Sequence, residues 1–342
     1  MKTHGFSILA LAGAALGGSL LSFVLFDGHG SATATKAPAA ARPSAPAACA
    51  YNFARVSGFQ RTKPLIYSEP ACESPRLEDL RSAMGTLVDG FKATGQLTSA
   101  SVYLRDFRQA EWTMYNGSES YDPGSMLKVP LLLTYLSMSE EDPSLLKRTW
   151  TCEKGDFNIP QFTAFPSAQA QLNVSYTVAQ LLDLAITSSD NRATVMLLRH
   201  VPQGRYLKTF TDLGLPVPDW NAKTYRMNVR DYSVFMKALY NSALLGPMNS
   251  ERALELMARS DFNRGLVAGL PPGVEVAHKF GEAGDPMEKQ LHETGLVYAD
   301  GNPYLITVMT RGSNLIHWPA RSPPSPDWST IACTRRSGCP VQ

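Results

Sequence analysis

Three short polar strings, widely separated in the chain, constrain its fold most strongly. They are Ser125–Lys128 (SMLK), Ser189–Asn191 (SDN) and Lys279–Gly281 (KFG). Together they supply a hydroxyl with an amine one helical turn away, a second hydroxyl with an amide, and a second amine. These groups can act together only if the fold brings all three strings to one place. Such a set suits acyl transfer through a serine ester, and three strings in this order carry weight that one string would not.

The first string offers a nucleophile and its base. Ser125 heads an apolar run with a helical pattern, where backbone N–H groups and the helix dipole favour developing negative charge. Lys128 lies three residues later, so its amine returns to the same face. In a dry site beside other cations such an amine loses proton affinity and can act as a general base. The simpler interpretation is a helix cap at Ser125 and a surface lysine at Lys128.

The second string fits a short loop between two helical runs. The Ser189 hydroxyl can relay a proton to a leaving nitrogen. The Asn191 amide can hold either a substrate carbonyl or the Lys128 amine. The alternative is that Ser, Asp and Asn here are ordinary turn residues and helix caps.

The third string ends a strand of apolar and β-branched residues. On an edge strand, Lys279 could lower the pKa of Lys128 and attract a substrate carboxylate. Gly281 would let a substrate backbone approach the strand closely. This string has little weight without the other two.

The order of the predicted elements indicates an α/β sheet interrupted by an all-helical subdomain at about residues 120–260. A helix is expected at 75–95, followed by strands at 101–107 and 111–115. The other expected elements are helices at 125–139, 177–186, 191–201, 230–240 and 250–258, and strands at 274–280, 291–298 and 304–309.

The N-terminus predicts export. Residues 5–26 form an apolar run behind Lys2, about long enough to cross a bilayer. Residues 1–29 are therefore either a signal peptide, cut after the small residues at 32–34, or an uncleaved membrane anchor. Both interpretations send the body of the protein out of the cytoplasm, to the periplasm or cell surface. An Ala/Pro-rich linker would follow at 30–48, and an oxidising compartment makes Cys49–Cys72 the favoured disulfide.

Composition narrows the possible partners. A formal net charge of +2 with no basic block argues against nucleic acid, and the five cysteines lack the spacing of a zinc site. No metal or cofactor is expected. The folded domain should span 49–312, because the proline-dense segment 313–342 cannot form a long helix and is expected to be a disordered tail.

The three strings resemble those of the penicillin-recognising serine hydrolases, in particular the class A β-lactamase-like branch, over roughly Leu65–Gly312. The resemblance implies a β-lactamase/transpeptidase-like fold: an antiparallel sheet flanked by helices, an all-α subdomain, and the active site between them. It implies a monomer acting on a small-molecule or peptide amide, with the membrane reached only through the N-terminal segment. By motif, Ser125 is similar to the acylated nucleophile, Lys128 to its base and Ser189 to the proton relay. The substrate-binding positions would be Asn191, Lys279, Gly281 and Glu282, with the Ser125 and Glu282 N–H groups as the oxyanion hole.

Three departures from that family pattern affect the expected activity. Class A enzymes use a loop glutamate to activate the deacylating water, but this chain has no glutamate between Glu153 and Glu251. Asp219, the one carboxylate in segment 214–228, is a doubtful substitute, so deacylation should be slow. Phe280 replaces a small hydroxyl residue that contacts a substrate carboxylate. Without a closing C-terminal helix, part of the apolar stripe at 77–91 would be left uncovered.

The expected activity is therefore that of a serine acyl-hydrolase with weak β-lactam turnover. Two alternatives stay open: a penicillin-binding or sensor protein that remains acylated, and a non-catalytic envelope protein that keeps the fold.

Overall fold

Strands from both ends of the folded region form one antiparallel sheet. The computed structural model describes residues 49–157, 167–222, 224–285, 287–299 and 302–312. The sheet has five strands in the order β4-β3-β9-β8-β7. Their bounds are β3 Ser99–Asp106, β4 Glu111–Tyr115, β7 Glu275–Gly284, β8 Lys289–Ala299 and β9 Asn302–Gly312. Because β7 pairs with β8 alone, β7 is an edge strand. Lys279 of β7 lies opposite Thr294 of β8.

A helical segment separates β4 from β7. Its helices are α2 Lys128–Glu141, α3 Val178–Thr187, α4 Asn191–His200, α5 Gln203–Asp212, α6 Val229–Tyr240 and α7 Pro247–Ala258, with α1 Glu78–Ala93 preceding the sheet. Short 3-10 turns are η1 Pro75–Leu77, η2 Gly124–Leu127, η3 Leu145–Lys147, η4 Lys154–Phe157 and η5 Val267–Gly269. The segment also contains a two-stranded ribbon, β5 Thr149–Thr151 with β6 Ser175–Thr177. The predicted all-α subdomain is therefore largely but not purely helical.

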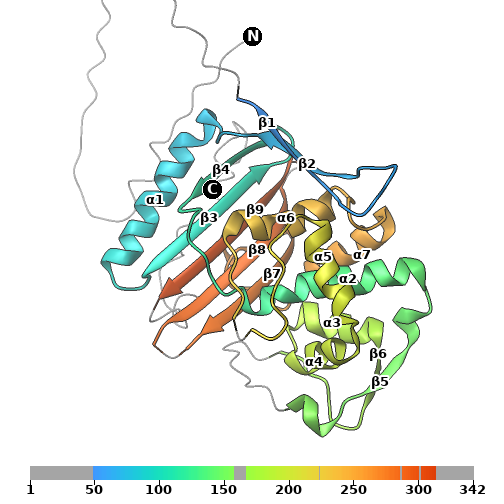
Figure 1. Ribbon diagram of the computed structural model, residues 1–342. Helices are drawn as coiled ribbons and strands as arrows, with labels where there is room; N and C mark the ends of the chain where they lie inside the picture. The colour runs from blue at the N-terminus through green and yellow to red at the C-terminus, as the bar shows by residue number, and fades with distance from the viewer. Residues whose placement is uncertain (1–48, 158–166, 223, 286, 300–301, 313–342) are drawn as a thin grey trace, which may run out of the picture. The chain divides into compact units, whose positions relative to one another are not determined.

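Helices cover both faces of the sheet (Figure 1). Successive side chains along a strand point to opposite faces of the sheet. Tyr103 of β3 belongs to the large core that includes α2, α3 and α6, whereas its neighbour Val102 lies outside that core. Of the predicted stripe, Leu77 and Met84 are buried, and the other three residues (Leu80, Leu87 and Phe91) are half-buried.

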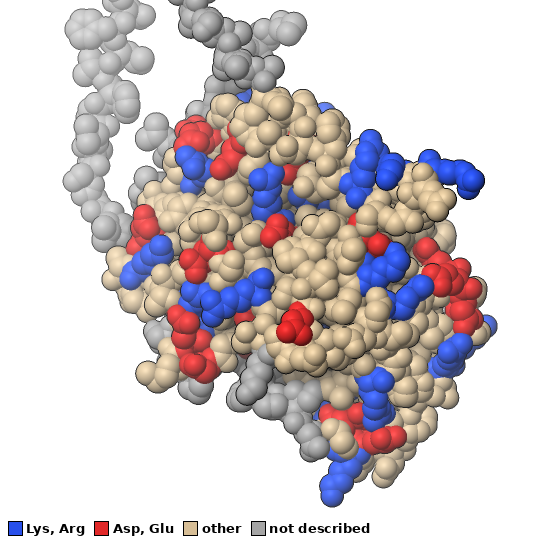
Figure 2. All heavy atoms as spheres, in the orientation of Figure 1, with Lys and Arg blue, Asp and Glu red and all other residues tan. Residues whose placement is uncertain are grey.

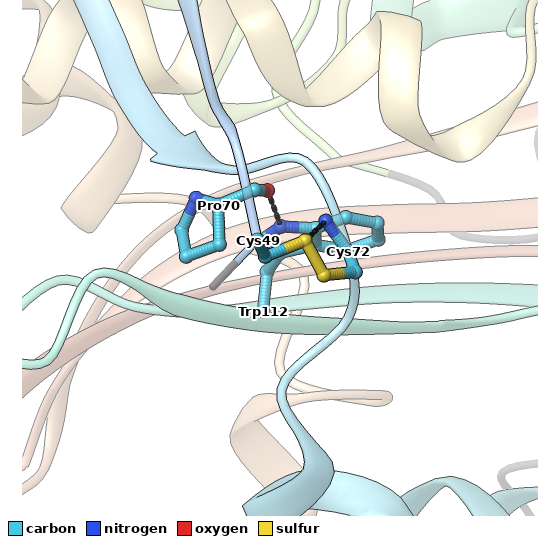
Figure 3. The surroundings of a disulfide bond; sticks show 4 residues. All are labelled: Cys49, Pro70, Cys72 and Trp112. Carbon is cyan, nitrogen blue, oxygen red and sulfur yellow. Dashed lines mark hydrogen bonds between the residues drawn. A yellow bond between two sulfur atoms is a disulfide. The ribbon is translucent and has the colours of Figure 1, made fainter. Parts of the chain in front are cut away.

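A small hairpin precedes α1 and is tied at its base. It consists of β1 Tyr51–Arg55 and β2 Leu65–Pro70. The predicted disulfide between Cys49 and Cys72 is present, with the two Cα atoms 6.0 Å apart. The indole of Trp112, on β4, donates to the Pro70 carbonyl at 2.8 Å beside this bond (Figure 3). The disulfide therefore closes the hairpin where it meets the main sheet.

The predicted fold class is confirmed, with some elements missed. The hairpin β1–β2, the ribbon β5–β6 and helix α5 were not foreseen. The predictions for 1–29, 30–48 and 313–342 lie outside the described residues. Within the described ranges, no helix combines the length and apolarity that crossing a membrane requires. Figure 2 shows acidic and basic side chains intermixed over the face in view.

Candidate active site

The three strings predicted to act together do lie together. The Nζ atom of Lys128 is 3.1 Å from Ser125 Oγ and 3.1 Å from Ser189 Oγ. The Nζ atom of Lys279 is 2.9 Å from the same Ser189 hydroxyl. One continuous set of hydrogen-bonding contacts thus runs from η2 through the α3–α4 loop to the edge strand β7.

Ser125 is held on a tight turn. It lies in η2, one turn ahead of α2, and not on the α-helix that the sequence predicted. Gly124 before it has φ +52°, and a Cβ there would lie 2.1 Å from the Glu282 carbonyl oxygen. The Tyr232 hydroxyl of α6 donates to the Met126 carbonyl at 2.7 Å. Strand β7 on one side and helix α6 on the other therefore fix the nucleophile's backbone.

Strand β8 holds the residues just before the nucleophile. The Asp122 N–H donates to Gln290 Oε1 at 3.0 Å, and the Asp122 carbonyl accepts from His292 Nε2 at 2.9 Å. The other ring nitrogen of His292 accepts from the Thr310 N–H at 3.1 Å, so the ring carries one proton. Burial lowers the pKa of His292 to about 4. This histidine is thus a neutral support that the sequence prediction missed.

Lys128 is surrounded by oxygen atoms that suit a neutral amine. The side chain is 4% exposed. Its Nζ atom lies 2.5 Å from the Ser189 carbonyl and 2.8 Å from Asn191 Oδ1, two oxygens that can only accept. A neutral amine has two N–H groups for these two oxygens and keeps its lone pair for a proton from Ser125 Oγ. Asn191 therefore holds the Lys128 amine, one of its two predicted roles.

Burial also favours the neutral amine energetically. It lowers the pKa of Lys128 from its usual value to about 7. The negative charges of Asp190 and Glu282 oppose this shift without cancelling it. A substantial fraction of the protein therefore carries a basic, unprotonated Lys128 at neutral pH.

Ser189 lies in a strained loop that its neighbour stabilises. Its φ is +53°, in the left-handed region that serine rarely adopts. Asp190 caps α4 by accepting from the Arg192 N–H at 3.0 Å and the Ala193 N–H at 3.2 Å, and it accepts from the Ala170 N–H at 2.8 Å. The capping interpretation of this string is confirmed for Asp190, whereas the catalytic role of Ser189 stays a prediction. The acidic residue just before a helical run was the sequence signal for the cap.

Lys279 is buried completely and covered by a ring. Its Nζ atom donates to Ser189 Oγ and to the Phe280 carbonyl, each at 2.9 Å, and lies 4.1 Å from the centre of the Phe280 ring. Burial and then the charge of Lys128 hold the pKa of Lys279 well below its usual value. The sequence predicted the lysine but not the ring over it.

Gly281 serves the packing of the chain itself. A Cβ at this position would lie 2.3 Å from the Pro123 carbonyl oxygen and 2.9 Å from the Met126 backbone nitrogen. The missing side chain thus lets β7 contact the turn that carries Ser125. Substrate contacts by Asn191, Lys279, Gly281 and Glu282 stay predictions.

Two further features bear on the expected chemistry. Asp219 is exposed and accepts from the Asn221 N–H at 2.9 Å, which makes it part of a local turn. Among the described residues, no group of three or more His, Cys, Asp and Glu side chains is arranged to bind a metal.

Comparison with known proteins finds the same fold elsewhere. A model of the beta-lactamase enzyme family matches residues 80–329. A variant of PBP-A in an acyl-enzyme complex with penicillin G is 23% identical, with a TM-score of 0.61 over 76% of this chain and 98% of that one. The beta-lactamase from Streptosporangium roseum is 20% identical, with a TM-score of 0.59 over 75% and 96% of the two chains. The TLA-1 extended spectrum beta-lactamase is 17% identical, with a TM-score of 0.61 over 75% and 96%. No match was found among curated proteins.

Proposed function

The chain belongs to the beta-lactamase enzyme family, and from this premise we propose that it is a serine hydrolase that opens an amide through an ester on Ser125. One observation carries the proposal. The Ser125 hydroxyl lies 3.1 Å from a buried amine whose acceptor-only neighbours leave its lone pair for the hydroxyl proton. The expected substrate is a β-lactam or an amide resembling a cell-wall peptide.

Acylation begins when Ser125 Oγ attacks the amide carbonyl and its proton passes to Lys128. The negative charge on the carbonyl oxygen is stabilised by the backbone N–H groups of Ser125 and Glu282. The new Lys128 ammonium can donate a third N–H to Ser189 Oγ, 3.1 Å away. Ser189 then gives its own proton to the leaving nitrogen as the C–N bond breaks, and it takes the Lys128 proton in exchange, which returns Lys128 to its neutral form. The net result is an ester on Ser125 and a neutral amine.

Deacylation is the slow step of this scheme. It needs a base for the attacking water, and the chain has no glutamate between positions 153 and 251. Loss of a catalytic contact of this importance costs a factor of about 10² to 10³ in rate. The ester should therefore persist long enough to be isolated.

A second function follows if the ester persists indefinitely. The protein would then bind β-lactams covalently as a receptor, without turnover. The same missing glutamate supports this alternative, and so does the similarity to PBP-A, a variant of which forms an acyl-enzyme complex with penicillin G.

The site of action is proposed to be outside the cytoplasm. Members of this family are usually extracytoplasmic. The disulfide between Cys49 and Cys72 fits an oxidising compartment. Export through the segment at 1–29 is part of the same proposal.

Labelling with a fluorescent penicillin tests the proposal. We expect a covalent label on the wild type, seen on a denaturing gel, that decays slowly during a chase with unlabelled penicillin. Ser125→Ala should carry no label, whereas Ser82→Ala, which alters an exposed serine on α1, should label like the wild type. A label that never decays would favour the receptor, and an unlabelled wild type would contradict both functions.

A further inference from the structure

We propose that the leaving-group side of this site selects amides without a carboxylate, because the Phe280 ring covers the amino group that would bind one. This inference rests on the proposed hydrolase function and adds the substrate class. Ser189 is the proposed proton donor to the leaving nitrogen, so the groups around Ser189 and Lys279 contact the leaving side of the substrate.

The first support is the saturation of the Lys279 amino group. As an ammonium it has three N–H groups, and two of them donate to Ser189 Oγ and to the Phe280 carbonyl. The face of the Phe280 ring, 4.1 Å from Nζ, occupies a third direction. As a neutral amine, the form that burial favours, the group has no charge to offer. A carboxylate is bound strongly by a charged donor aimed directly at it.

The second support is the rigidity of this aromatic cover. Phe280 stacks on Phe262, with ring centres 4.2 Å apart and planes 19° apart, and both rings are buried. The chain just before Phe262 is fixed, because the Asp261 N–H donates to the Thr187 carbonyl at 2.8 Å and the Ser188 hydroxyl donates to the Asp261 carboxylate at 2.7 Å. Uncovering Lys279 would therefore break a stacked pair that is anchored on the Ser189 loop.

The third support is a hollow beside the Phe280 ring. It measures about 200 Å³, and Phe262 and Phe280 form part of its wall together with Ser188, Asp261 and Asn263. An apolar cavity of about 150 Å³ can hold benzene. A single ring or a short side chain thus fits, with polar wall groups for one or two hydrogen bonds. The Asp261 carboxylate would repel an anion placed there.

One cation could still recruit an anion to this hollow. Arg264 is an exposed part of its wall. The test therefore has to separate a carboxylate held by Arg264 from a hollow that rejects carboxylates.

The experiment compares two substrates that differ only in charge. Penicillin G and its methyl ester are each mixed with the wild type, and the rate of acylation is followed by intact-protein mass spectrometry. We expect the acid to react no faster than the ester. Phe280→Thr removes the ring and adds a hydroxyl, and should raise the acid-to-ester ratio about ten- to hundredfold, the value of a hydrogen bond to a charged group. Phe280→Leu, the matched control, keeps an apolar side chain beside Lys279 and adds no hydroxyl, so it should raise the ratio far less.

The outcomes separate the two proposals. A wild type that reacts faster with the acid than with the ester overturns this inference even if no variant folds. If Arg264→Gln abolishes that preference, the anion site is on Arg264. An unchanged ratio in folded Phe280→Thr also overturns it. If neither compound acylates the wild type, the proposed function is wrong, and this inference is wrong with it.

Discussion

The rate of acylation should depend on whether the Lys128 amine is protonated. Two acceptor-only oxygens fix the orientation of the amine, and burial lowers its pKa to about 7. Only the neutral form can remove the Ser125 proton. The acylation rate should therefore rise with pH through about 7 and level off above it.

A charge substitution tests the origin of that pH dependence. The Glu282 carboxylate stabilises the Lys128 ammonium and so raises its pKa. Glu282→Gln should move the midpoint of the acylation profile to lower pH, because the ammonium loses a favourable charge. The measurement is the rate of fluorescent penicillin labelling between pH 5 and 9.

Glu275→Gln is the control for this shift. Glu275 is exposed at the far end of the same strand, so its substitution should leave the midpoint where it is. A rate that does not depend on pH near 7, or a midpoint that rises in Glu282→Gln, would show that Lys128 is not the base.

At the scale of elements, the contact between β7 and η2 positions the nucleophile. Gly281→Ala would place a methyl group 2.3 Å from the Pro123 carbonyl oxygen, and backbone atoms on both sides cannot yield easily. We expect a loss of about 1–3 kcal/mol in the free energy of unfolding, typical of overpacking. Acylation should slow as well, because η2 must shift with Ser125. Urea unfolding and labelling rates measure the two effects.

A second glycine provides the matched control. Gly90 lies within α1, where an added Cβ meets no atom within 4 Å. Gly90→Ala should stabilise the protein by about 0.5–1 kcal/mol, because alanine favours a helix, and should leave acylation unchanged. Equal behaviour of the two variants would mean that the β7–η2 contact is not tight.

The elements that the sequence predicted are those with strong periodic patterns. The stripe of α1 and the apolar strands β7 to β9 are long enough to be recognised. Strand β1 was missed because it has no buried alternation: Tyr51 and Phe53 are 57% and 62% exposed. Helix α5 was missed because Pro202 and polar residues open it.

The residues of the site were predictable but their environment was not. Motif spacing identified Ser125, Lys128, Ser189 and Lys279. The neutral His292 depends on its contact with Asp122, and the ring of Phe280 is held by stacking on Phe262, so both depend on segments that are apart in the sequence. Local pattern carries no information about such contacts.

At the scale of the whole folded region, a buried ionic cluster joins the N-terminal hairpin to the main core. Glu69 of β2 is fully buried and lies 2.5 Å from Arg105 on β3, with Arg230 at 3.1 Å and Lys237 at 3.5 Å on α6. Burial disfavours the ionised Glu69, but Lys237 and Arg105 outweigh it and lower its pKa. The Glu69 carboxylate is thus the shared ion-pair partner of three basic side chains.

Glu69→Gln should destabilise the protein more than its small change in size suggests. The amide keeps the volume but removes the negative charge, which leaves Lys237 and Arg105 buried without compensation. Breaking a buried pair in this way costs about 3–5 kcal/mol. Glu78→Gln, which alters an exposed pair with Arg81, should change the free energy of unfolding by less than about 0.5 kcal/mol. Urea unfolding at pH 7 with the disulfide intact measures both. Similar stabilities for the two variants would mean that the cluster does not hold the hairpin to the core.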